Sequence, residues 1–322
     1  MQIGVDIYTL KAYSMHCQGE LPQTNLIYIP AASDHIEPFQ KKTKGKMKMK
    51  KFVSLLLAML LVASLAACGS KTDDNNGKDN TLVLGTSADY APFEFMYKGE
   101  NGTMQYGGID VSVGQYIAEN MGKELKVENM AFDYLLPALV KGDFDIVISA
   151  MEVDEKRLQS ADFSDPYYTD LPPAILVKAS NAASYKTLAD FAGKSVAAQT
   201  GTTKLDIVND QLTGANAVPL QLVTDMVNEL VNGKVDAIVV DGAVAKQYAE
   251  TNKDLVIADA SSELGAAQPY CVAVAKGDPK GLLPAINAAI AKMNKENKLE
   301  SFISAADALK DVWQEVTAAD PS

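Results

Sequence analysis

The sequence has 322 residues, of which 48% are hydrophobic and 22% charged, values typical of a soluble globular protein with room for two domains. Its formal charge of −12 is unevenly spread, because residues 68–322 contain 21 Lys and Arg against 37 Asp and Glu, a charge of −16. An acidic body of this kind excludes nucleic acid as an expected partner, since binding to phosphates requires a basic surface.

The histidines and cysteines exclude several kinds of catalytic and metal site. Both histidines, His16 and His35, precede residue 68, and the remainder contains only Cys68 and Cys271 as cysteines. A Ser-His or Cys-His nucleophile is therefore impossible there, as is a zinc site with histidine or several cysteine ligands. We expect no metal and no cofactor, and we expect Cys271 to be a packing residue.

An export signal is predicted before the body. Lys46-Met47-Lys48-Met49-Lys50-Lys51 is a basic cluster, and the run of 16 residues after it, Phe52–Ala67, is apolar except for two serines. The run is shorter than the roughly 20 residues that span a bilayer, so residues 47–67 are typical of a signal peptide. Leu65–Cys68 resembles the lipobox of bacterial lipoproteins, which implies that Cys68 is lipidated and anchors the protein at the outer face of the cell membrane. The alternative is a plain signal peptide with a chance cysteine.

The segments on either side of this signal are expected to lie outside the fold. Signal peptides begin close to the start of a chain, so residues 1–46 are interpreted as an upstream extension assigned in error, with Met47 or Met49 as the true start. Residues 69–80 contain no apolar side chain, and 68–80 is therefore predicted to be a flexible tether.

From residue 81 onward, short apolar strands alternate with helices, a pattern typical of parallel βαβ units. Asn101-Gly102 and Gly107-Gly108 mark turns and indicate a hairpin between them, and Asp110 is the expected N-cap of the next helix. The expected strands are 81–86, 124–129, 144–149, 174–178, 195–199, 220–223, 235–240 and 270–276. The expected helices are 110–121, 133–141, 187–191, 204–212, 225–231, 242–251, 279–294 and 299–316, with Trp313 in the core or capping a lobe.

One segment is echoed later in the chain. Ala138–Ser149 and Glu229–Val240 share a helix end, a glycine, an aspartate three residues later and an apolar strand, at an offset of 91 residues. The echo predicts two similar lobes, although chance similarity between such common units is an alternative. On this register Ala150 corresponds to Asp241, and both follow the carboxyl end of a strand, where open α/β sheets bind ligands.

A single arginine follows the first of these strands. Arg157 lies in a polar turn after Ser149, and a planar guanidinium suits a carboxylate held by two parallel hydrogen bonds. From these residues alone, an exposed and charged helix start is the alternative.

Seven segments in this order make the body similar to the bacterial extracellular solute-binding proteins of the polar amino-acid uptake class, the receptors of ABC importers. The segments are Gly85–Phe95, Gly108–Val111, Phe132–Leu139, Gly142–Val147, Asp162–Tyr168, Gln199–Thr202 and Val235–Asp241. The resemblance implies an α/β, two-lobe periplasmic-binding-protein-like fold (type II), with two hinge strands and a ligand cleft between the lobes. Lobe 1 would comprise residues 81–171 and 270–322, and lobe 2 residues 172–269. The implied partners are an amino acid, ABC permease subunits and, through the lipid, the membrane; we expect a monomer.

The resemblance also implies a set of ligand contacts. Arg157 and the helix start at Thr202 and Thr203 would bind the ligand carboxylate, and Asp241 would hold its ammonium. The full expected set is Ser87, Tyr90, Phe132, Ala150, Glu152, Arg157, Gln199, Thr202, Thr203 and Asp241. Three of these depart from the family, since Ser87 replaces an acid of several members, Glu152 replaces a common hydroxyl residue, and Gln199 occupies a position that is basic in some relatives.

Glu152 bears on the choice of ligand. Two carboxylates beside one ammonium leave an excess negative charge, which is costly to bury unpaired. Glu152 could pair with a second positive charge on the ligand, be held by a protein cation such as Lys156 or Arg157, or be protonated; it could also point to solvent. We expect a polar amino acid, with a cationic one ahead of the others.

The leading hypothesis is thus an amino-acid receptor of an ABC importer, without enzymatic activity. The alternative is an exported enzyme on the same fold, because some similar proteins are dehydratases that act on cyclic carboxylates with acidic side chains. Asp89, Asp133 and Glu152 keep this alternative open.

Overall fold

The computed structural model describes residues 80–313, which fall within one unit of the chain. The predictions for the signal peptide, for lipidation of Cys68 and for most of the tether lie outside the described residues, as does the end of the last expected helix. Within residues 80–313, no helix is both long and apolar enough to cross a membrane.

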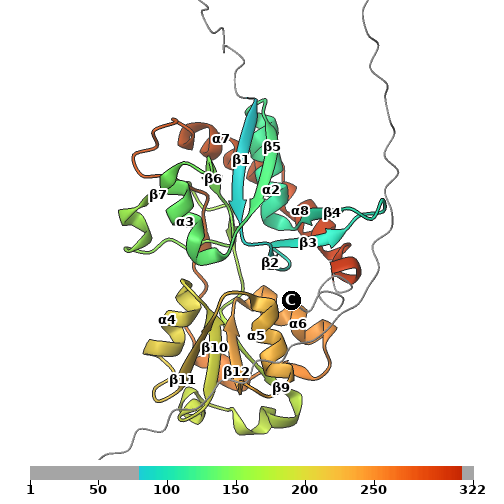
Figure 1. Ribbon diagram of the computed structural model, residues 1–322, viewed down its shortest axis with the longest axis vertical. Coiled ribbons are helices and arrows are strands. Elements are labelled where there is room, and N and C mark those ends of the chain that lie inside the picture. Colours follow the sequence, from blue (N-terminus) through green and yellow to red (C-terminus); the bar gives the residue numbers. More distant parts are fainter. Residues whose placement is uncertain (1–79, 314–322) are drawn as a thin grey trace, which may run out of the picture. The chain divides into compact units, whose positions relative to one another are not determined.

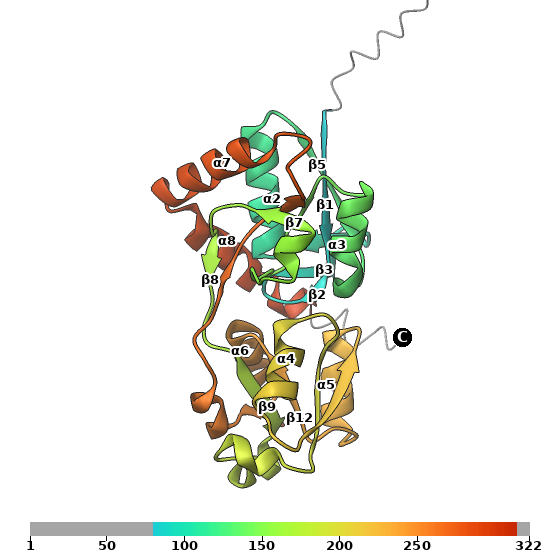
Figure 2. The same ribbon diagram turned by 90° about the vertical axis from the view of Figure 1, so that its left-hand side faces the viewer.

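The first lobe is built on a five-stranded sheet with the order β5-β1-β6-β15-β7. β1 pairs in parallel with β5 and β6, and β15 pairs antiparallel with β6 and β7. Helices α2 and α3 lie on opposite sides of β1 (Figure 2). The elements are β1 (Thr81–Thr86), α2 (Ile109–Asn120), β5 (Glu124–Asn129), α3 (Phe132–Lys141), β6 (Ile146–Val147), β7 (Ala161–Phe163), β15 (Ala273–Ala275), α7 (Leu283–Lys295) and α8 (Lys298–Asp307).

The second lobe carries a sheet of the same design, with the order β11-β10-β12-β9-β13 (Figure 1). β10 pairs in parallel with β11 and β12, and β9 pairs antiparallel with β12 and β13. The elements are β9 (Ala174–Lys178), η2 (Ala179–Ser184), η3 (Leu188–Phe191), β10 (Ser195–Gln199), α4 (Thr203–Asp210), β11 (Asn216–Leu220), α5 (Val223–Val231), β12 (Ala237–Val240), α6 (Gly242–Thr251), β13 (Leu255–Ile257) and η4 (Asp259–Glu263).

The echo in the sequence is a structural repeat. β6 and β12 occupy the same place in the two sheet orders, and each is preceded by the aspartate of the echo. The Asp145 amide donates to Val83 O at 2.9 Å and its Oδ2 accepts from Val83 N at 2.7 Å. Asp236 makes the same two contacts to Ser195, at 2.8 and 2.9 Å. The aspartate thus holds the neighbouring strand in register in both lobes, and Ala150 and Asp241 follow at equivalent places.

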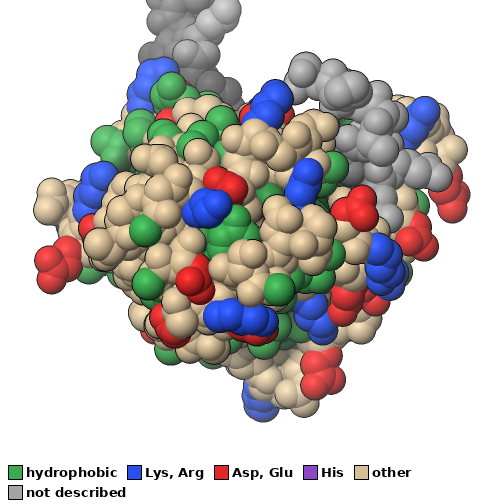
Figure 3. All heavy atoms as spheres, turned by 90° about the horizontal axis from the view of Figure 1, so that it is seen from below, with side chains coloured by type: hydrophobic (Ala, Val, Ile, Leu, Met, Phe, Trp, Pro, Cys, Tyr) green, Lys and Arg blue, Asp and Glu red, His purple; other side chains and the backbone are tan. Residues whose placement is uncertain are grey.

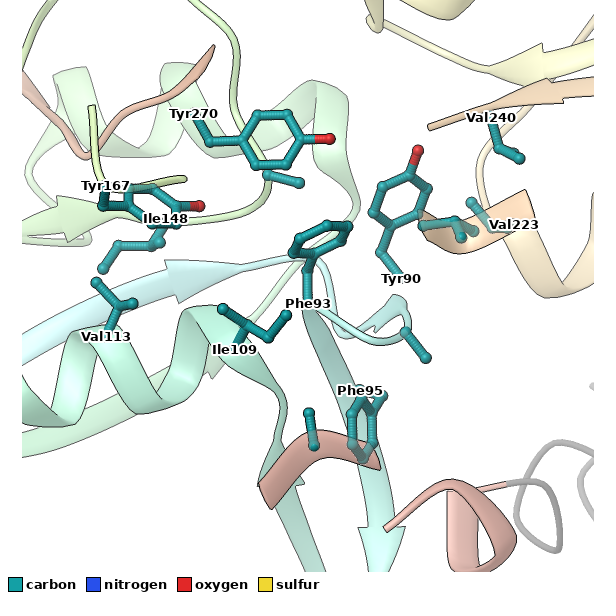
Figure 4. Packing of buried hydrophobic residues seen from close by; sticks show 14 of the residues in the cluster. Tyr90, Phe93, Phe95, Ile109, Val113, Ile148, Tyr167, Val223, Val240 and Tyr270 are labelled. Carbon is teal, nitrogen blue, oxygen red and sulfur yellow. The ribbon is translucent and has the colours of Figure 1, made fainter. Parts of the chain in front are cut away.

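Two short strands connect the sheets. β8 (Tyr168–Thr169) pairs antiparallel with β14 (Pro269–Tyr270). Their aromatic rings pack on Phe93, whose ring centroid lies 5.3 Å from that of Tyr168 and 5.2 Å from that of Tyr270. Figure 4 shows Phe93 and Tyr270 beside Tyr90, and Val223 and Val240 of the second lobe belong to the same apolar cluster. The crossings are therefore anchored in a continuous apolar core.

The first lobe also has a small antiparallel sheet of three strands, β2 (Asp89–Tyr90), β3 (Glu94–Lys98) and β4 (Met104–Gly107). β3 and β4 form a hairpin, and Asn101-Gly102 lies in its turn as predicted. Trp313 is buried and packs on Phe95 and on Tyr248 of α6, as the core interpretation predicted.

Several element boundaries differ from the predictions. The N-cap of α2 is Gly108, with φ 119°, where a Cβ would lie 2.0 Å from Phe93 O. Asp110 is instead buried and accepts bonds from Ala150 N and Tyr167 Oη, so its side chain serves the tertiary structure rather than the cap. The strand expected at 220–223 is wrong, because β11 ends at Leu220 and Val223 begins α5.

Two expected strands are shorter in the structure. The strand expected at 144–149 pairs only at Ile146–Val147, and the one expected at 270–276 divides into β14 and β15. In both cases the chain leaves the sheet near the crossings, so a continuous apolar run overestimates the paired length.

On the face shown in Figure 3, basic and acidic side chains are interspersed rather than gathered by sign.

Candidate functional site

A pocket lies where the carboxyl ends of the central strands of both lobes meet. It is lined by Ser87, Tyr90, Glu94, Phe132, Ser149, Ala150, Glu152, Arg157, Gln199, Thr202, Thr203, Lys204 and Asp241. All ten predicted contact residues are in this set. Its free volume is about 20 Å³, enough for about one water molecule. Accommodating a larger molecule requires the lining side chains or the lobes to move.

Arg157 forms one end of the pocket and is 7% exposed, so the exposed-turn alternative is wrong. It begins a short 3₁₀ helix, η1 (Arg157–Gln159), whose first amide donates to Asp154 Oδ1 at 2.7 Å. Its Nη1 donates to Glu152 O at 2.6 Å and its Nη2 donates to Gly201 O, in the second lobe, at 3.2 Å. Its guanidinium carbon lies 5.3 Å from the centre of the Phe132 ring. Burial lowers the pKa of Arg157, an effect that Asp154 and Glu152 oppose.

The start of α4 faces the same end. Thr202 is the N-cap, and its Oγ1 accepts from Leu205 N at 3.4 Å. Gly201 before it has φ 79°, and a Cβ there would lie 3.0 Å from Asp133 Cβ in the first lobe. A glycine thus permits the close approach that places a helix N-terminus, with its positive dipole end, near Arg157.

Asp241 also lines the pocket and comes directly after β12. The Tyr90 hydroxyl donates to Asp241 Oδ2 at 2.7 Å and accepts from Asp241 N at 3.0 Å. Tyr90 lies in the first lobe, so the pair joins the lobes. Burial and the carboxylate of Asp241 raise the pKa of Tyr90 well above its ordinary value, so the phenol stays a donor.

Glu152 lies beside Asp241 and is 6% exposed, so the solvent-facing alternative is wrong. It is held by a protein cation, but this cation is Lys204 rather than Lys156 or Arg157. Lys204 Nζ lies 2.9 Å from Glu152 Oε1 and 2.5 Å from Asp241 Oδ1. Burial disfavours the charged form of Lys204, but Asp241 and Glu152 outweigh it and raise its pKa. Lys156 is exposed, and Arg157 contacts only the main-chain carbonyl of Glu152.

The remaining predicted contacts line the walls. Ser87 N donates to Ser149 Oγ at 3.1 Å, and Gln199 Nε2 donates to Gln221 O at 3.0 Å. Ala150 has a left-handed backbone, with φ 44°, and its amide donates to Asp110 Oδ2 at 2.6 Å. Strained backbone of this kind is concentrated at functional sites.

Glu94, Ser149 and Lys204 line the pocket but were not among the predicted contacts. Ser149 Oγ donates to Glu94 Oε1 at 2.6 Å. Burial, followed by the nearby Asp110, raises the pKa of Glu94 well above its ordinary value. Glu94 and Lys204 could have been suspected from position alone, because each lies within a few residues of a predicted contact. The sequence contains one further indication of a special role for Arg157, because it is the only arginine in the sequence.

The acids that kept an enzyme in consideration are dispersed. Asp89 accepts from Val223 N at 2.6 Å and Asp133 accepts from Gln221 Nε2 at 3.3 Å, and of the three only Glu152 lines the pocket. Within residues 80–313, no group of three or more His, Cys, Asp and Glu could hold a metal ion. Cys271 is buried, as its packing interpretation predicted, and burial raises its pKa to about 11.

Known proteins with similar sequences are binding proteins. The arginine-binding extracellular protein ArtP of Bacillus subtilis is 32% identical over 259 residues, covering 79% of this chain and 96% of the relative. A probable histidine-binding protein of Campylobacter jejuni is 29% identical over 264 residues, covering 79% and 98%. Such relatives support a solute-binding protein rather than an enzyme.

Solved structures lead to the same conclusion. A Streptococcus pneumoniae amino acid ABC transporter substrate-binding protein, bound to L-arginine, has a TM-score of 0.67 and 33% identity, over 71% of this chain and 94% of that one. The two-lobe α/β fold is therefore the one predicted. The model of the bacterial extracellular solute-binding proteins, family 3, matches residues 82–304, and the chain belongs to that family.

Proposed function

We propose that this protein is an exported receptor that captures a polar amino acid and delivers it to an ABC permease. One observation carries the proposal. The pocket brings Arg157 and a helix N-terminus together with the carboxylates of Asp241 and Glu152. An α-amino acid carries a carboxylate and an ammonium on one carbon, so it presents both charges that such a pocket complements.

The two charges would be bound by different elements. Arg157 already directs two guanidinium nitrogens at main-chain carbonyls, and a carboxylate would offer it a stronger, charged acceptor. The ammonium would bind to Asp241, which is fixed by the Tyr90 hydroxyl. Phe132 lies on the guanidinium face and would cover the ligand from the first lobe.

The ligand would also hold the lobes together. Polar contacts from Tyr90, Asp89 and Arg157 already join the first lobe to Asp241, Val223 and Gly201 of the second. We assign residues 81–171 and 270–322 to lobe 1 and 172–269 to lobe 2. The lobes would part about β8 and β14 to admit the ligand, because the pocket has room for only about one water molecule.

The location follows from the leader. The Leu65–Cys68 sequence supports lipidation of Cys68 and anchoring at the outer face of the cell membrane, and we propose that the protein is a monomer. Residues 69–80 would then hold the lobes away from the lipid within reach of the permease.

A thermal-shift screen against the common amino acids tests the proposal. A ligand that binds only the native state at a hundredfold excess over its Kd adds about 2.7 kcal/mol of stability. We expect at least one polar amino acid to raise the melting temperature of the wild type and of Lys246→Ala, an exposed control on α6. The Asp241→Asn variant should lose most of that shift. If no amino acid stabilises the wild type, the proposal is wrong.

A further inference from the structure

Lys204 places a positive charge between two carboxylates of the pocket. It lies in the first turn of α4, in the second lobe, and its side chain is 6% exposed. Its ammonium contacts Asp241 of its own lobe at 2.5 Å and Glu152 of the first lobe at 2.9 Å. A buried lysine between two buried carboxylates is a built ion triad rather than a surface contact, where such pairs contribute little.

Each carboxylate oxygen of the triad already has a donor. Glu152 Oε1 and Asp241 Oδ1 accept from Lys204, Glu152 Oε2 accepts from the Thr203 hydroxyl, and Asp241 Oδ2 accepts from Tyr90. The ammonium of a bound amino acid must therefore share these oxygens with Lys204. Two ammonium groups would then face two carboxylates, which is an even charge balance.

The charges of the whole lining balance before a ligand is added. Two carboxylates, Glu152 and Asp241, face two cations, Arg157 and Lys204. Glu94 also lines the pocket, but its raised pKa favours the neutral form. Asp154 Oδ2 lies 3.4 Å from Arg157 Nε, but Asp154 does not line the pocket and its side chain is 34% exposed, so water also solvates its charge.

An amino acid with an uncharged side chain has no net charge and preserves this balance. A cationic side chain adds one positive charge, and no lining carboxylate is left to compensate it. The lining also includes Ser87 and Gln199, which are polar but uncharged. A buried unpaired charge is costly, while an uncharged polar side chain needs only hydrogen-bond partners.

We propose that Lys204 is a specificity-determining residue, which takes the place of a ligand side-chain cation beside Glu152 and sets the pocket to prefer amino acids with uncharged polar side chains. The inference rests on the proposed function and narrows its ligand class. This ligand class replaces the cationic one that was expected from Glu152 alone. It also differs from the arginine named for two similar proteins.

Matched ligand pairs test this directly. Arginine and citrulline have side chains of similar shape, as do lysine and norleucine, but only the first of each pair carries a side-chain charge. Their Kd values would be measured by calorimetry on the wild type, Lys204→Gln, Lys156→Gln and the double variant Lys204→Gln/Glu152→Gln. Lys156 is exposed in the turn just before Arg157, so its substitution removes the same charge without touching the triad.

We expect the wild type to bind citrulline more tightly than arginine. Lys204→Gln should shift the ratio of the two Kd values toward arginine by at least about tenfold, because couplings between close, desolvated charges are of that size or larger. Lys156→Gln should change the ratio less than about twofold, as expected for a screened charge. The double variant should return the ratio toward the wild-type value, since it removes the unpaired Glu152 charge as well.

The outcomes separate this inference from the proposed function. Tighter binding of arginine than of citrulline by the wild type, or an unchanged ratio in Lys204→Gln, overturns the inference alone. Absence of binding by any amino acid, with all variants folded by circular dichroism, overturns the proposed function and the inference together. If Lys204→Gln does not fold, the double variant decides, because retention of the wild-type ratio supports the inference and a shift toward arginine contradicts it.

Discussion

Substitution of Arg157 by alanine should weaken amino-acid binding by two to three decades or more. The side chain is 7% exposed and its guanidinium is held by Glu152 O and Gly201 O at 2.6 and 3.2 Å. Removing one partner of a desolvated ion pair costs about 3–5 kcal/mol, and each 1.4 kcal/mol is about tenfold in Kd. Arg157→Lys should restore only part of this loss, because an ammonium lacks the forked geometry of a guanidinium.

The same substitution also removes a contact between the lobes, so its effect on folding must be measured separately. Hydrogen bonds to charged groups contribute about 1.5–3 kcal/mol each, and we expect Arg157→Ala to unfold at lower denaturant concentration than the wild type. Calorimetric titration with the tightest amino acid gives Kd, and urea unfolding without ligand gives the stability. Lys156→Ala, next to it and exposed, should change neither. A Kd for the folded Arg157→Ala within about threefold of the wild-type value would show that Arg157 is not a main ligand contact, since the expected loss corresponds to several kcal/mol.

Three further predictions concern the anchor, a buried acid and the contact between the lobes. Cys68→Ala should move the protein from the membrane to the soluble fraction and abolish fatty-acid labelling; a membrane-bound variant with an unlabelled wild type contradicts this. Burial raises the pKa of Asp110 to about 6, so the stability tied to its protonation is lost as pH rises from about 4 through about 6. The difference in unfolding free energy between Asp110→Asn and the wild type should therefore grow in favour of the variant over that range, by up to about 3 kcal/mol. A difference that does not change with pH would argue against this prediction. Tyr90→Phe should weaken amino-acid binding about tenfold or more, because Asp241 Oδ2 loses a donor to a charged group; an unchanged Kd is the contrary result.

The fold was predictable because its signals are local and repeated. Strands 81–86, 124–129, 174–178 and 195–199 were placed at their true bounds, and helix 242–251 likewise. The echo of Asp145 in Asp236 correctly indicated two similar lobes, because the same aspartate fixes the same neighbouring strand in each. The antiparallel strands at the sheet edges were missed, since segments as short as Ala161–Phe163 carry too few residues for a periodic pattern.

Most residues that line the pocket could be predicted from the sequence, but the ion pairs among them could not. Position after a strand, together with the family resemblance, brought Arg157, Glu152 and Asp241 to one place, as the structure does. The partner of Glu152 could not be identified, because Lys204 is separated from it by 52 residues and lies in the other lobe. Lys156 and Arg157 were named because they are near in sequence, whereas the ion pair depends on how the two sheets face each other.

The most direct test of the proposed function is a crystal structure of the protein with the amino acid that gives the largest thermal shift. We expect an amino acid between the lobes, with its carboxylate on the Arg157 guanidinium and the start of α4, and its ammonium among Asp241, Glu152 and Lys204. An amino acid bound elsewhere on the protein, or bound in this pocket without contact to Arg157, would contradict the central claim.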